Sequence, residues 1–322
     1  MNEYISCNST IDTNIGIAIC TAKRPKMLLD CIKSISLLNA PDDVSLSVII
    51  VENDTTRSVD LEQLNALCPY PIEYTCETQR GIPFARNRTL EIAREKNLDF
   101  LALIDDDETA DPDWLRAHLE TIREFSADAT FGPVSFEYPD TTPEWYPKEE
   151  PAKMENGAQS SWAATNNNLL SSRVFSEDGY AMQFDTDFTG GGEDIDFFQR
   201  LHRKGGKTVW CADGRVTEVV AEARVTLPIY LNRARIVARN LVMLSLKRKG
   251  LAKTYWRFML RMFKCLLKSG IIHIDLLMPF SRSRKISSAK KVNALRLISE
   301  AKGYAQGIYF RSPVRIRPIE GK

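Results

Sequence analysis

The sequence predicts an α/β fold, in which strands alternate with helices along the chain and assemble into a sheet. Short apolar runs recur at residues 15–20, 46–51 and 100–104, each of a length typical of a strand. The run 100–104 shows no alternation of apolar and polar residues, as expected when helices cover both faces of a parallel sheet. Segments with a helical spacing of apolar residues lie between these runs, which is the element order of an α/β protein.

Two helices are expected between the three strands. The first begins at Pro25, because proline fits the first turn of a helix and apolar residues then recur every three or four positions. It ends before Pro41, which cannot continue it. The second helix is expected over residues 83–96.

Two changes of composition suggest how the chain is organised. Prolines at every fourth position over 139–151 exclude a helix interior and predict a surface excursion within the main domain. From Arg224 onward, 23 Lys and Arg residues stand against three acidic ones. We predict a polar N-terminal segment (1–13), a main α/β domain (14–240) and a basic helical C-terminal region (241–322).

The net charge of +1 conceals a strong partition of charge along the chain. Residues 1–200 carry a charge of −20, and residues 201–322 carry a charge of +21. Because an acidic region repels phosphate and a basic region attracts it, the second part is the one expected to meet an anionic partner.

Several features bear on where the protein works. The seven cysteines are scattered, and no pair has metal-ligand spacing, which indicates reduced thiols. The first fourteen residues do not form a secretory signal. No uncharged apolar stretch approaches the roughly 20 residues that a membrane-spanning helix needs. We therefore expect a cytoplasmic protein without membrane-spanning segments.

Four consecutive acidic residues, 105–108, directly follow the strand at 100–104. Ligands of open α/β sheets bind beyond the carboxyl ends of strands, and adjacent carboxylates repel one another unless a cation lies among them. Hard divalent cations such as Mg²⁺ and Mn²⁺ commonly bridge such carboxylates to substrate phosphates. The alternative is a solvated acidic turn that caps the helix near Trp114.

A second acidic site is expected where three glycines, 190–192, precede a helix whose first turn contains Glu193, Asp194 and Asp196. Glycine lets the backbone approach a ligand closely, and the helix dipole stabilises carboxylates at this end. One of these carboxylates could therefore serve as a general base, or all of them could merely favour the helix. No G-x-G-x-x-G motif follows the first strand, which argues against a dinucleotide site.

Together these segments resemble the inverting family 2 glycosyltransferases with the GT-A fold, and in particular the succinoglycan-type exopolysaccharide subgroup. The resemblance covers about residues 14–240 and depends on six motifs in the family's order. They are Ile17 to Pro25, with its Thr-x-x-Arg-Pro turn, Val51 to Asp54, Gly81 to Asn87, Asp105 to Asp107, Ala164 to Leu170, and Gly192 to Leu201. The segment Arg224 to Thr226 and the group Arg233, Arg235 and Arg239 also resemble the subgroup's ending. The implied fold is a Rossmann-like mixed sheet flanked by helices, followed here by a basic helical extension.

The resemblance also implies a role for each matching residue, although the family's common Thr-Tyr-Asn-Arg opening is Thr-Ala-Lys-Arg here. The residues expected to bind the nucleotide sugar are Thr21, Arg24, Glu52, Asp54, Arg86, Asp105 and Asp106. Asp105 and Asp107 would hold Mn²⁺ or Mg²⁺. Asn167 and Glu193 would lie beside the acceptor, and Asp194 would be the catalytic base. Helix capping and surface charge are the alternative roles for Thr21, Arg24 and Arg86.

The implied reaction is a metal-dependent, inverting transfer of a sugar from a nucleotide-diphosphate sugar, with UDP as the expected nucleotide. The acceptor would be a hydroxyl of a lipid-linked or growing glycan in cell-surface polysaccharide synthesis. Asp194 would take the proton of that hydroxyl as it attacks the anomeric carbon, in one displacement that needs no second nucleophile. His118 and His202 lie in helical patterns and are expected to be helix-face residues.

A basic amphipathic helix is expected in the C-terminal region. Its basic residues, spaced by 4, 4, 3 and 4, form one stripe: Lys253, Arg257, Arg261, Lys264 and Lys268. Aromatic and aliphatic residues lie between them, a pattern typical of a helix at a membrane interface. We expect an anionic membrane surface as a partner and a peripheral position at the cytoplasmic face. The alternative is a helix packed onto the catalytic domain with its basic edge in water.

Two other classes of function compete with sugar transfer. Nucleotidyl transfer also uses clustered carboxylates and a metal, and would release pyrophosphate from a nucleoside triphosphate. A non-catalytic protein could instead bind an anionic partner through its basic tail. The basic region has no recognised nucleic-acid module, so nucleic acid is not an expected partner.

Overall fold

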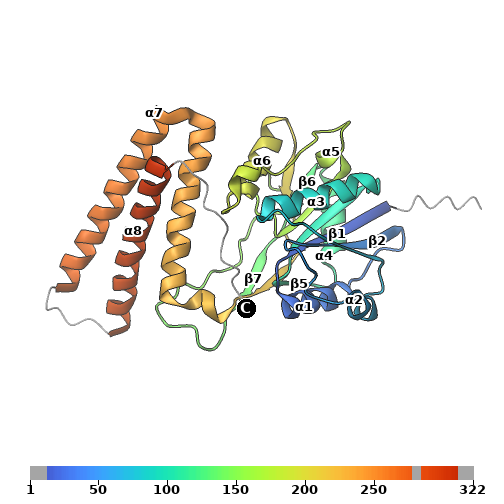
Figure 1. The fold of residues 1–322 in the computed structure, drawn as a ribbon, viewed down its shortest axis with the longest axis horizontal. Helices are drawn as coiled ribbons and strands as arrows, with labels where there is room; N and C mark the ends of the chain where they lie inside the picture. The colour runs from blue at the N-terminus through green and yellow to red at the C-terminus, as the bar shows by residue number, and fades with distance from the viewer. Residues whose placement is uncertain (1–12, 278–283, 311–322) are drawn as a thin grey trace, which may run out of the picture.

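The computed structural model describes residues 13–277 and 284–310, and it has the predicted α/β fold (Figure 1). The main sheet has seven strands in the order β3-β2-β1-β4-β8-β6-β9. They are β1 (Thr13–Thr21), β2 (Val44–Glu52), β3 (Ile72–Cys76), β4 (Phe100–Asp105), β6 (Ala129–Phe131), β8 (Asn167–Ser171) and β9 (Thr208–Trp210). Strand β8 is antiparallel to both of its neighbours and the other pairs are parallel, so the sheet is mixed, as expected.

A smaller sheet connects the acidic turn to a strand far along the chain. It consists of β5 (Glu108–Ala110), β10 (Val216–Val219) and β7 (Val134–Glu137), in that spatial order. Strand β10 runs antiparallel to β5 in a register that sets Glu218 opposite Glu108. This pairing brings a further carboxylate next to the acidic turn.

Helices cover both faces of the main sheet (Figure 1). They are α1 (Pro25–Ile35), α2 (Leu61–Leu67) and α4 (Trp114–Glu124) on one face, and α3 (Ile82–Glu95), α5 (Ser172–Phe175) and α6 (Glu193–Arg203) on the other. Alternate residues of β1 point to opposite layers, since Ile17 packs in the first core and Ala18 in the second. Both faces of the strand are buried, which explains why its sequence is apolar without alternation.

The proline-rich stretch forms a long loop between β7 and β8. Apart from an isolated bridge between Gln159 and Val209, the loop contains no strand or helix over residues 138–166. Its side chains over 139–151 are exposed or half-buried. The predicted surface excursion is confirmed.

The C-terminal region is a bundle of three helical segments beside the main domain (Figure 1). Helix α7 (Leu227–Leu277) is interrupted at Gly250, whose φ of 73° lies in the left-handed region that glycine tolerates. The two segments of α7 and the helix α8 (Arg284–Phe310) share a small apolar core. Phe258 lies in this core and is 2% exposed.

The predicted domain limits can be compared with these elements. The limit at residue 240 falls inside the first segment of α7, because this helix already begins at Leu227. The predicted N-terminal segment lies outside the described residues except for Thr13, which opens β1. None of the described helices has a stretch long and apolar enough to cross a membrane. The six cysteines within the described ranges are free thiols, and Cys7 lies outside them.

Candidate active site

A cavity of about 420 Å³ opens at the carboxyl ends of β1 and β4. Its walls come from segments that are distant in sequence: the ends of these strands, the start of α3, the loop before β8, the start of α6, and the 3-10 helix η2 (Glu222–Val225) with the first turns of α7. Eight of the predicted site residues line it: Thr21, Arg24, Arg86, Asp105, Asp106, Asp107, Glu193 and Asp194.

In the acidic turn, Asp106 and Glu108 are buried, and Asp105 and Asp107 are half-buried. Asp106 is 4% exposed and accepts hydrogen bonds from Thr21 Oγ1 at 2.6 Å and from Arg24 Nη1 at 3.0 Å. Burial raises the pKa of Asp106 to about 7, against the opposing effect of the Arg24 charge. Burial and a neighbouring carboxylate also raise the pKa of Asp107, which lies 3.5 Å from Arg24. The alternative of a solvated turn is therefore wrong, and Thr21 and Arg24 are not merely capping or surface residues.

A buried ion pair joins α3 to α6. Arg86 Nη1 donates to Glu193 Oε1 at 2.6 Å, and Nη2 donates to Asp105 Oδ1 at 3.4 Å. Burial lowers the pKa of Arg86, but the charges of Asp105 and Glu193 outweigh it and raise the pKa above its ordinary value. Arg86 is only 7% exposed, so it is not a surface charge. It fixes the acidic end of β4 relative to the start of α6.

Asp194 lies in the first turn of α6 and lines the cavity. The preceding Gly191 and Gly192 have φ values of 108° and 92°, which other residues adopt only with strain. This turn points the N-terminus of α6 at the cavity, where the helix dipole stabilises an ionised carboxylate. Asp194 Oδ1 accepts the backbone N–H of Ile195 at 2.7 Å. The carboxylate is thus held by its own helix at the cavity wall, as a general base requires.

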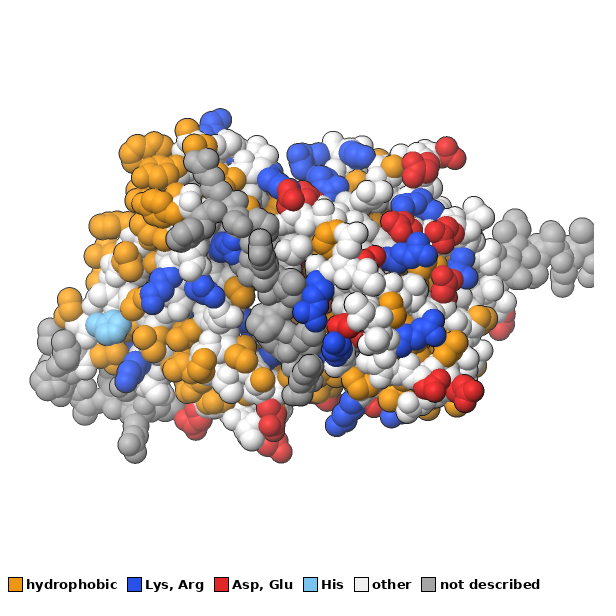
Figure 2. All heavy atoms as spheres, viewed as in Figure 1, with side chains coloured by type: hydrophobic (Ala, Val, Ile, Leu, Met, Phe, Trp, Pro, Cys, Tyr) orange, Lys and Arg blue, Asp and Glu red, His pale blue; other side chains and the backbone are white. Residues whose placement is uncertain are grey.

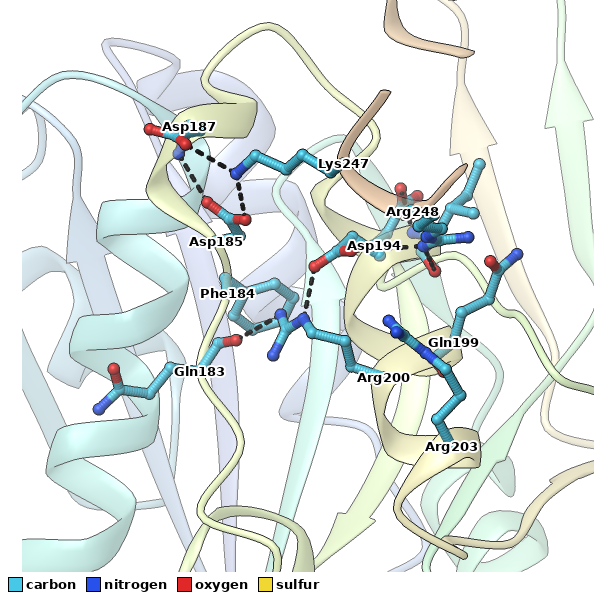
Figure 3. A network of polar contacts seen from close by, with 12 residues as sticks. Gln183, Phe184, Asp185, Asp187, Asp194, Gln199, Arg200, Arg203, Lys247 and Arg248 are labelled. Carbon is cyan, nitrogen blue, oxygen red and sulfur yellow. Dashed lines mark hydrogen bonds and ion pairs between the residues drawn. The ribbon is translucent and has the colours of Figure 1, made fainter. Parts of the chain in front are cut away.

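Helix α7 holds this acidic segment in place (Figure 3). Lys247 bridges the two carboxylates of the loop before α6, one of which is Asp185. Arg248 donates to Asp196 Oδ1 at 3.3 Å, and Asn240 Nδ2 donates to a carbonyl oxygen of the glycine loop at 2.8 Å. Asp196 is therefore a structural residue. Residues expected to belong to a separate basic region instead help to shape the cavity.

Glu52 is buried and does not line the cavity. It is 0% exposed, and its carboxylate accepts hydrogen bonds from the backbone of Lys23 at 2.6 Å, from Ser58 Oγ at 2.6 Å and from the Tyr74 hydroxyl at 2.7 Å. Asp54 is 5% exposed, and its hydrogen bond with Lys23 lowers its pKa. Among the described residues of this strand end, Asn53 lines the cavity and the two predicted acids do not. In this structure both acids support the cavity wall.

Asn167 was expected beside the acceptor, but the structure places it in the core. It is 2% exposed and accepts a hydrogen bond from Trp114 Nε1 at 2.7 Å, while its amide donates to two backbone carbonyl oxygens. Its neighbour Asn166 lines the cavity and donates to Glu108 at 2.6 Å. Successive side chains of an extended segment point to opposite sides, so only one of these two asparagines can face the cavity.

His118 is a buried helix-face residue, as expected. Its ring nitrogens contact Thr130 Oγ1 at 2.7 Å and Asn167 Oδ1 at 2.9 Å, and it is not among the residues that line the cavity. Burial lowers its pKa to about 4. It is therefore neutral at physiological pH and makes no direct contribution to the cavity.

The cavity also contains residues that are not among the predicted site residues. Glu218 and Arg224 form an ion pair in its wall, and Arg224 also lies 3.6 Å from Asp107. Burial raises the pKa of Glu218 to about 7, against the opposing charge of Arg224. Arg224 and Arg233 do match the ending of the resembled subgroup, which is the signal that could have identified them. Glu218 has no such signal, since only the pairing of β10 with β5 brings it here.

The acidic turn supplies carboxylates of the kind that hard cations bind. Asp105, whose side chain is 37% exposed, and Asp107 both line the cavity, and their cationic partners stand 3.4 Å or more away. Across the described residues, no group of three or more His, Cys, Asp or Glu could hold a metal ion. A cation here would take two protein carboxylates and complete its shell with phosphate and water oxygens, which is typical of Mg²⁺. The carboxylates of Asp105 and Asp107 are therefore suitable ligands for the expected Mn²⁺ or Mg²⁺.

The chain is similar to known proteins in both sequence and fold. A family model described as Glycosyl transferase family 2 matches residues 16–190. Over 233 residues the chain is 34% identical to the succinoglycan biosynthesis protein ExoM of Rhizobium meliloti (strain 1021), covering 68% of this chain and 71% of the relative. Crystal structures of S. aureus TarS 1–349, one of them in complex with UDP-GlcNAc, superpose with TM-scores of 0.51 and 0.52 at 13% identity, over 93% of both chains. The family model spans the first five predicted motifs and ends at residue 190, before the motif Gly192 to Leu201.

Proposed function

The chain belongs to glycosyltransferase family 2, and from this premise we propose that it transfers a sugar from a UDP-sugar to a hydroxyl of a lipid-linked or growing glycan during cell-surface polysaccharide synthesis. One observation carries the proposal: Asp194 and the acidic turn after β4 line the same cavity. The ExoM relative, named for succinoglycan biosynthesis, supports the polysaccharide assignment, and the UDP-GlcNAc complex of TarS supports a UDP-sugar donor.

The arrangement favours a single displacement with inversion. Asp194 takes the proton of the acceptor hydroxyl, whose oxygen forms a bond to the anomeric carbon of the donor sugar. The bond between that carbon and the diphosphate oxygen breaks at the same time, and the nucleoside diphosphate leaves. A base on one wall and the diphosphate site on another allow attack and departure on opposite faces of the sugar.

The acidic turn is assigned to the diphosphate. Asp105 and Asp107 would hold Mn²⁺ or Mg²⁺, which as a Lewis acid offsets the charge of the leaving diphosphate when it is bound. Arg24 and Arg224 both contact Asp107, so they hold this carboxylate in position and add positive charge at the same end of the cavity.

Membership of a glycosyltransferase family removes support from the two competing functions. A nucleotidyltransferase would release pyrophosphate from a nucleoside triphosphate, and a non-catalytic protein would release neither product. A panel of sugar nucleotides, scored for release of nucleoside diphosphate with Mn²⁺ and with Mg²⁺, tests the proposal. Release of UDP from one UDP-sugar is expected; release of pyrophosphate from UTP, or no turnover of any donor, would contradict it.

We also propose that the second segment of α7, residues 251–277, holds the protein at the cytoplasmic face of the membrane. Large apolar side chains stand out from the bundle there: Trp256 is 69% exposed, Phe263 63%, Leu260 59%, Ile274 58%, Ile271 57% and Leu267 53%. They recur every three or four residues on one side of the helix, whereas Phe258 points into the bundle core. Figure 2 shows hydrophobic side chains gathered at this outer edge of the molecule.

The charges beside this face suit an anionic bilayer. The predicted basic stripe, Lys253 to Lys268, runs along the same helix, and each basic residue near such a surface contributes about 1 kcal/mol. A second copy of the chain would bring like charges together instead. This segment packs against the other helices of the bundle through Phe258, and its opposite face is exposed. The alternative, a helix that packs its apolar face onto the catalytic domain, therefore does not explain the exposed apolar side chains.

Co-sedimentation of the full chain with liposomes tests this attachment. Binding to anionic vesicles is expected to exceed binding to neutral ones, to weaken at high salt, and to fall in the double variant Trp256→Glu/Phe263→Glu. Leu37→Glu is the matched control, because Leu37 is 70% exposed on the catalytic domain. A full-length chain that remains in the supernatant with anionic vesicles at low salt would rule the attachment out.

A further inference from the structure

A second cavity, of about 270 Å³, lies between the catalytic domain and the C-terminal bundle. Tyr138 and Tyr146 of the proline-rich loop form one side, and Tyr230 at the start of α7 with Glu300 of α8 forms the other. The volume is slightly below the range of about 300–1,000 Å³ that small-ligand sites occupy, so the cavity holds part of a ligand rather than a whole one. The proline-rich part of the loop after β7, residues 138–151, does not line the first cavity and instead forms a wall of this second one.

The aromatic side chains of this cavity form a fixed cluster. The rings of Tyr146 and Tyr230 lie 5.5 Å apart and meet edge to face, and those of Tyr138 and Tyr146 lie 5.9 Å apart. The Tyr138 hydroxyl accepts the backbone N–H of Glu149 at 2.8 Å, and a proline at every fourth position restricts the loop. The three tyrosines are only half-buried, so part of each ring is open to a ligand.

The second cavity adjoins the catalytic one. Arg224 and Arg233 line both, so the two cavities meet across these side chains. Arg224 is also bound to Glu218 and lies 3.6 Å from Asp107 at the diphosphate end. A ligand in the second cavity would therefore lie beside the donor and approach it from the side of the helical bundle.

The lining indicates the chemistry of the ligand. Aromatic faces pack against the apolar faces of sugar rings, and guanidinium and carboxylate groups hydrogen-bond to hydroxyls. Arg233 and Glu300 bring both signs of charge to this lining, together with tyrosine hydroxyls. The lining also has apolar side chains, among them Phe136, Val237 and Leu241, on which the apolar face of a sugar ring can pack. The charged side chains among them are unsuited to a lipid chain, which needs a wall without charges, and the carboxylates are unsuited to a phosphate alone. Burial raises the pKa values of Tyr146 and Tyr230, so both hydroxyls remain neutral donors.

We propose that the aromatic cavity between the proline-rich loop and the C-terminal bundle binds the acceptor glycan, at sugar residues adjoining the one that is glycosylated. This inference deepens the proposed function, on which it rests. It assigns the loop at 138–149 and the start of α7 to acceptor recognition, and it leaves donor binding to the first cavity.

The test separates acceptor binding from donor chemistry. Tyr146→Ala and Tyr230→Ala are each compared with the corresponding Phe variant, which keeps the ring, and with Tyr309→Ala, a tyrosine that is 67% exposed on α8. The acceptor probe is the lipid-linked saccharide fraction extracted from membranes of polysaccharide-producing cells. A second probe is the oligosaccharide released from that fraction, titrated calorimetrically without a donor. UDP affinity and donor hydrolysis without acceptor are measured on every variant.

The Ala variants should raise the KM for the acceptor and the Kd for the released oligosaccharide about tenfold, which corresponds to about 1.4 kcal/mol. UDP affinity and donor hydrolysis should not change in any variant. The Phe variants keep the ring and lose the hydroxyl donor, so their acceptor affinity should lie between that of the Ala variants and that of the unmodified protein. Tyr309→Ala should resemble the unmodified protein. Unchanged oligosaccharide affinity in the Ala variants, or no oligosaccharide binding to the unmodified protein, would overturn the inference. A protein that binds the oligosaccharide but neither binds UDP nor turns over any donor would refute the proposed function and leave the glycan site supported.

Discussion

The catalytic cavity and the outer face of the helical bundle differ in which side chains they bury: charged side chains are buried in the cavity, and large apolar side chains are exposed on the outer face. In the cavity, Arg86 and Glu193 are almost fully buried against each other. On the outer face, Arg257 is exposed to solvent beside Trp256, an apolar side chain that is itself 69% exposed. Buried charges must be paired, and a large exposed apolar face usually marks an interaction surface. One region is thus built for a small charged ligand and the other for an extended partner.

The largest effect expected in the cavity concerns the acidic turn. Asp107→Ala should abolish metal-dependent binding of UDP, because the carboxylates reach the diphosphate only through the cation. Calorimetric titration of both proteins with UDP, with and without Mn²⁺, measures this. Asp111→Ala is the control, since Asp111 is an exposed acid near the same turn. If the affinity for UDP were equal in all four combinations of protein and metal, the metal would have no role in UDP binding.

The next largest effect is expected at the buried ion pair between Arg86 and Glu193 in the cavity. Arg86→Met should lower the free energy of unfolding by about 3–5 kcal/mol, because Glu193 then loses its buried cation. The double variant Arg86→Met/Glu193→Met should recover much of this loss. Urea denaturation gives the free energy of unfolding of the unmodified protein and of both variants. A loss below about 1 kcal/mol in Arg86→Met would mean that this ion pair does not hold α3 to α6.

His118 should make stability depend on pH. Its folded pKa of about 4 lies below the ordinary value of 6.5, so between these values the unfolded chain binds more protons and stability falls as pH falls. From pH 7 to pH 5 this residue should account for a loss of about 2 kcal/mol. His118→Gln, compared with the unmodified protein by urea denaturation at both pH values, should show a correspondingly smaller loss. An identical pH dependence in the two proteins would contradict the assignment.

The smallest effect is expected on the outer face. Arg257→Gln should change the free energy of unfolding by less than about 0.5 kcal/mol, since exposed charges contribute little to stability. The same variant should weaken binding to anionic vesicles. If urea denaturation gave Arg257→Gln a loss comparable to that of Arg86→Met, the contrast between the two regions would fail.

The fold could be predicted because its signals are local. The strands at 15–20 and 100–104 are apolar throughout, and they lie inside β1 and β4, whose two faces are both buried. Pro25 opens α1, as its position in the pattern predicts. The domain limit at 240 could not be predicted from composition, because α7 begins thirteen residues earlier and contributes Lys247 and Arg248 to the support of the glycine loop.

The site could be predicted only in part, because tertiary contacts decide which polar side chains face the cavity. Asn166 and Asn167 are equivalent in sequence, and the pairing of β8 determines which of them is buried. Glu52 ends an apolar strand as a ligand-binding acid would, yet hydrogen bonds from distant residues occupy its carboxylate. Glu218 is adjacent to the acidic turn only through strand pairing.

The proposed role of Asp194 as the catalytic base is the central claim, and Asp194→Asn tests it most directly. The rate of sugar transfer, measured with the donor that the panel identifies, should fall by roughly 10²–10⁴-fold, the usual contribution of a positioned general base. Affinity for the donor should be unchanged, and Asp178→Asn, at an exposed acid of the catalytic domain that does not line the cavity, should transfer normally. Transfer by Asp194→Asn at the rate of the unmodified protein would contradict the account.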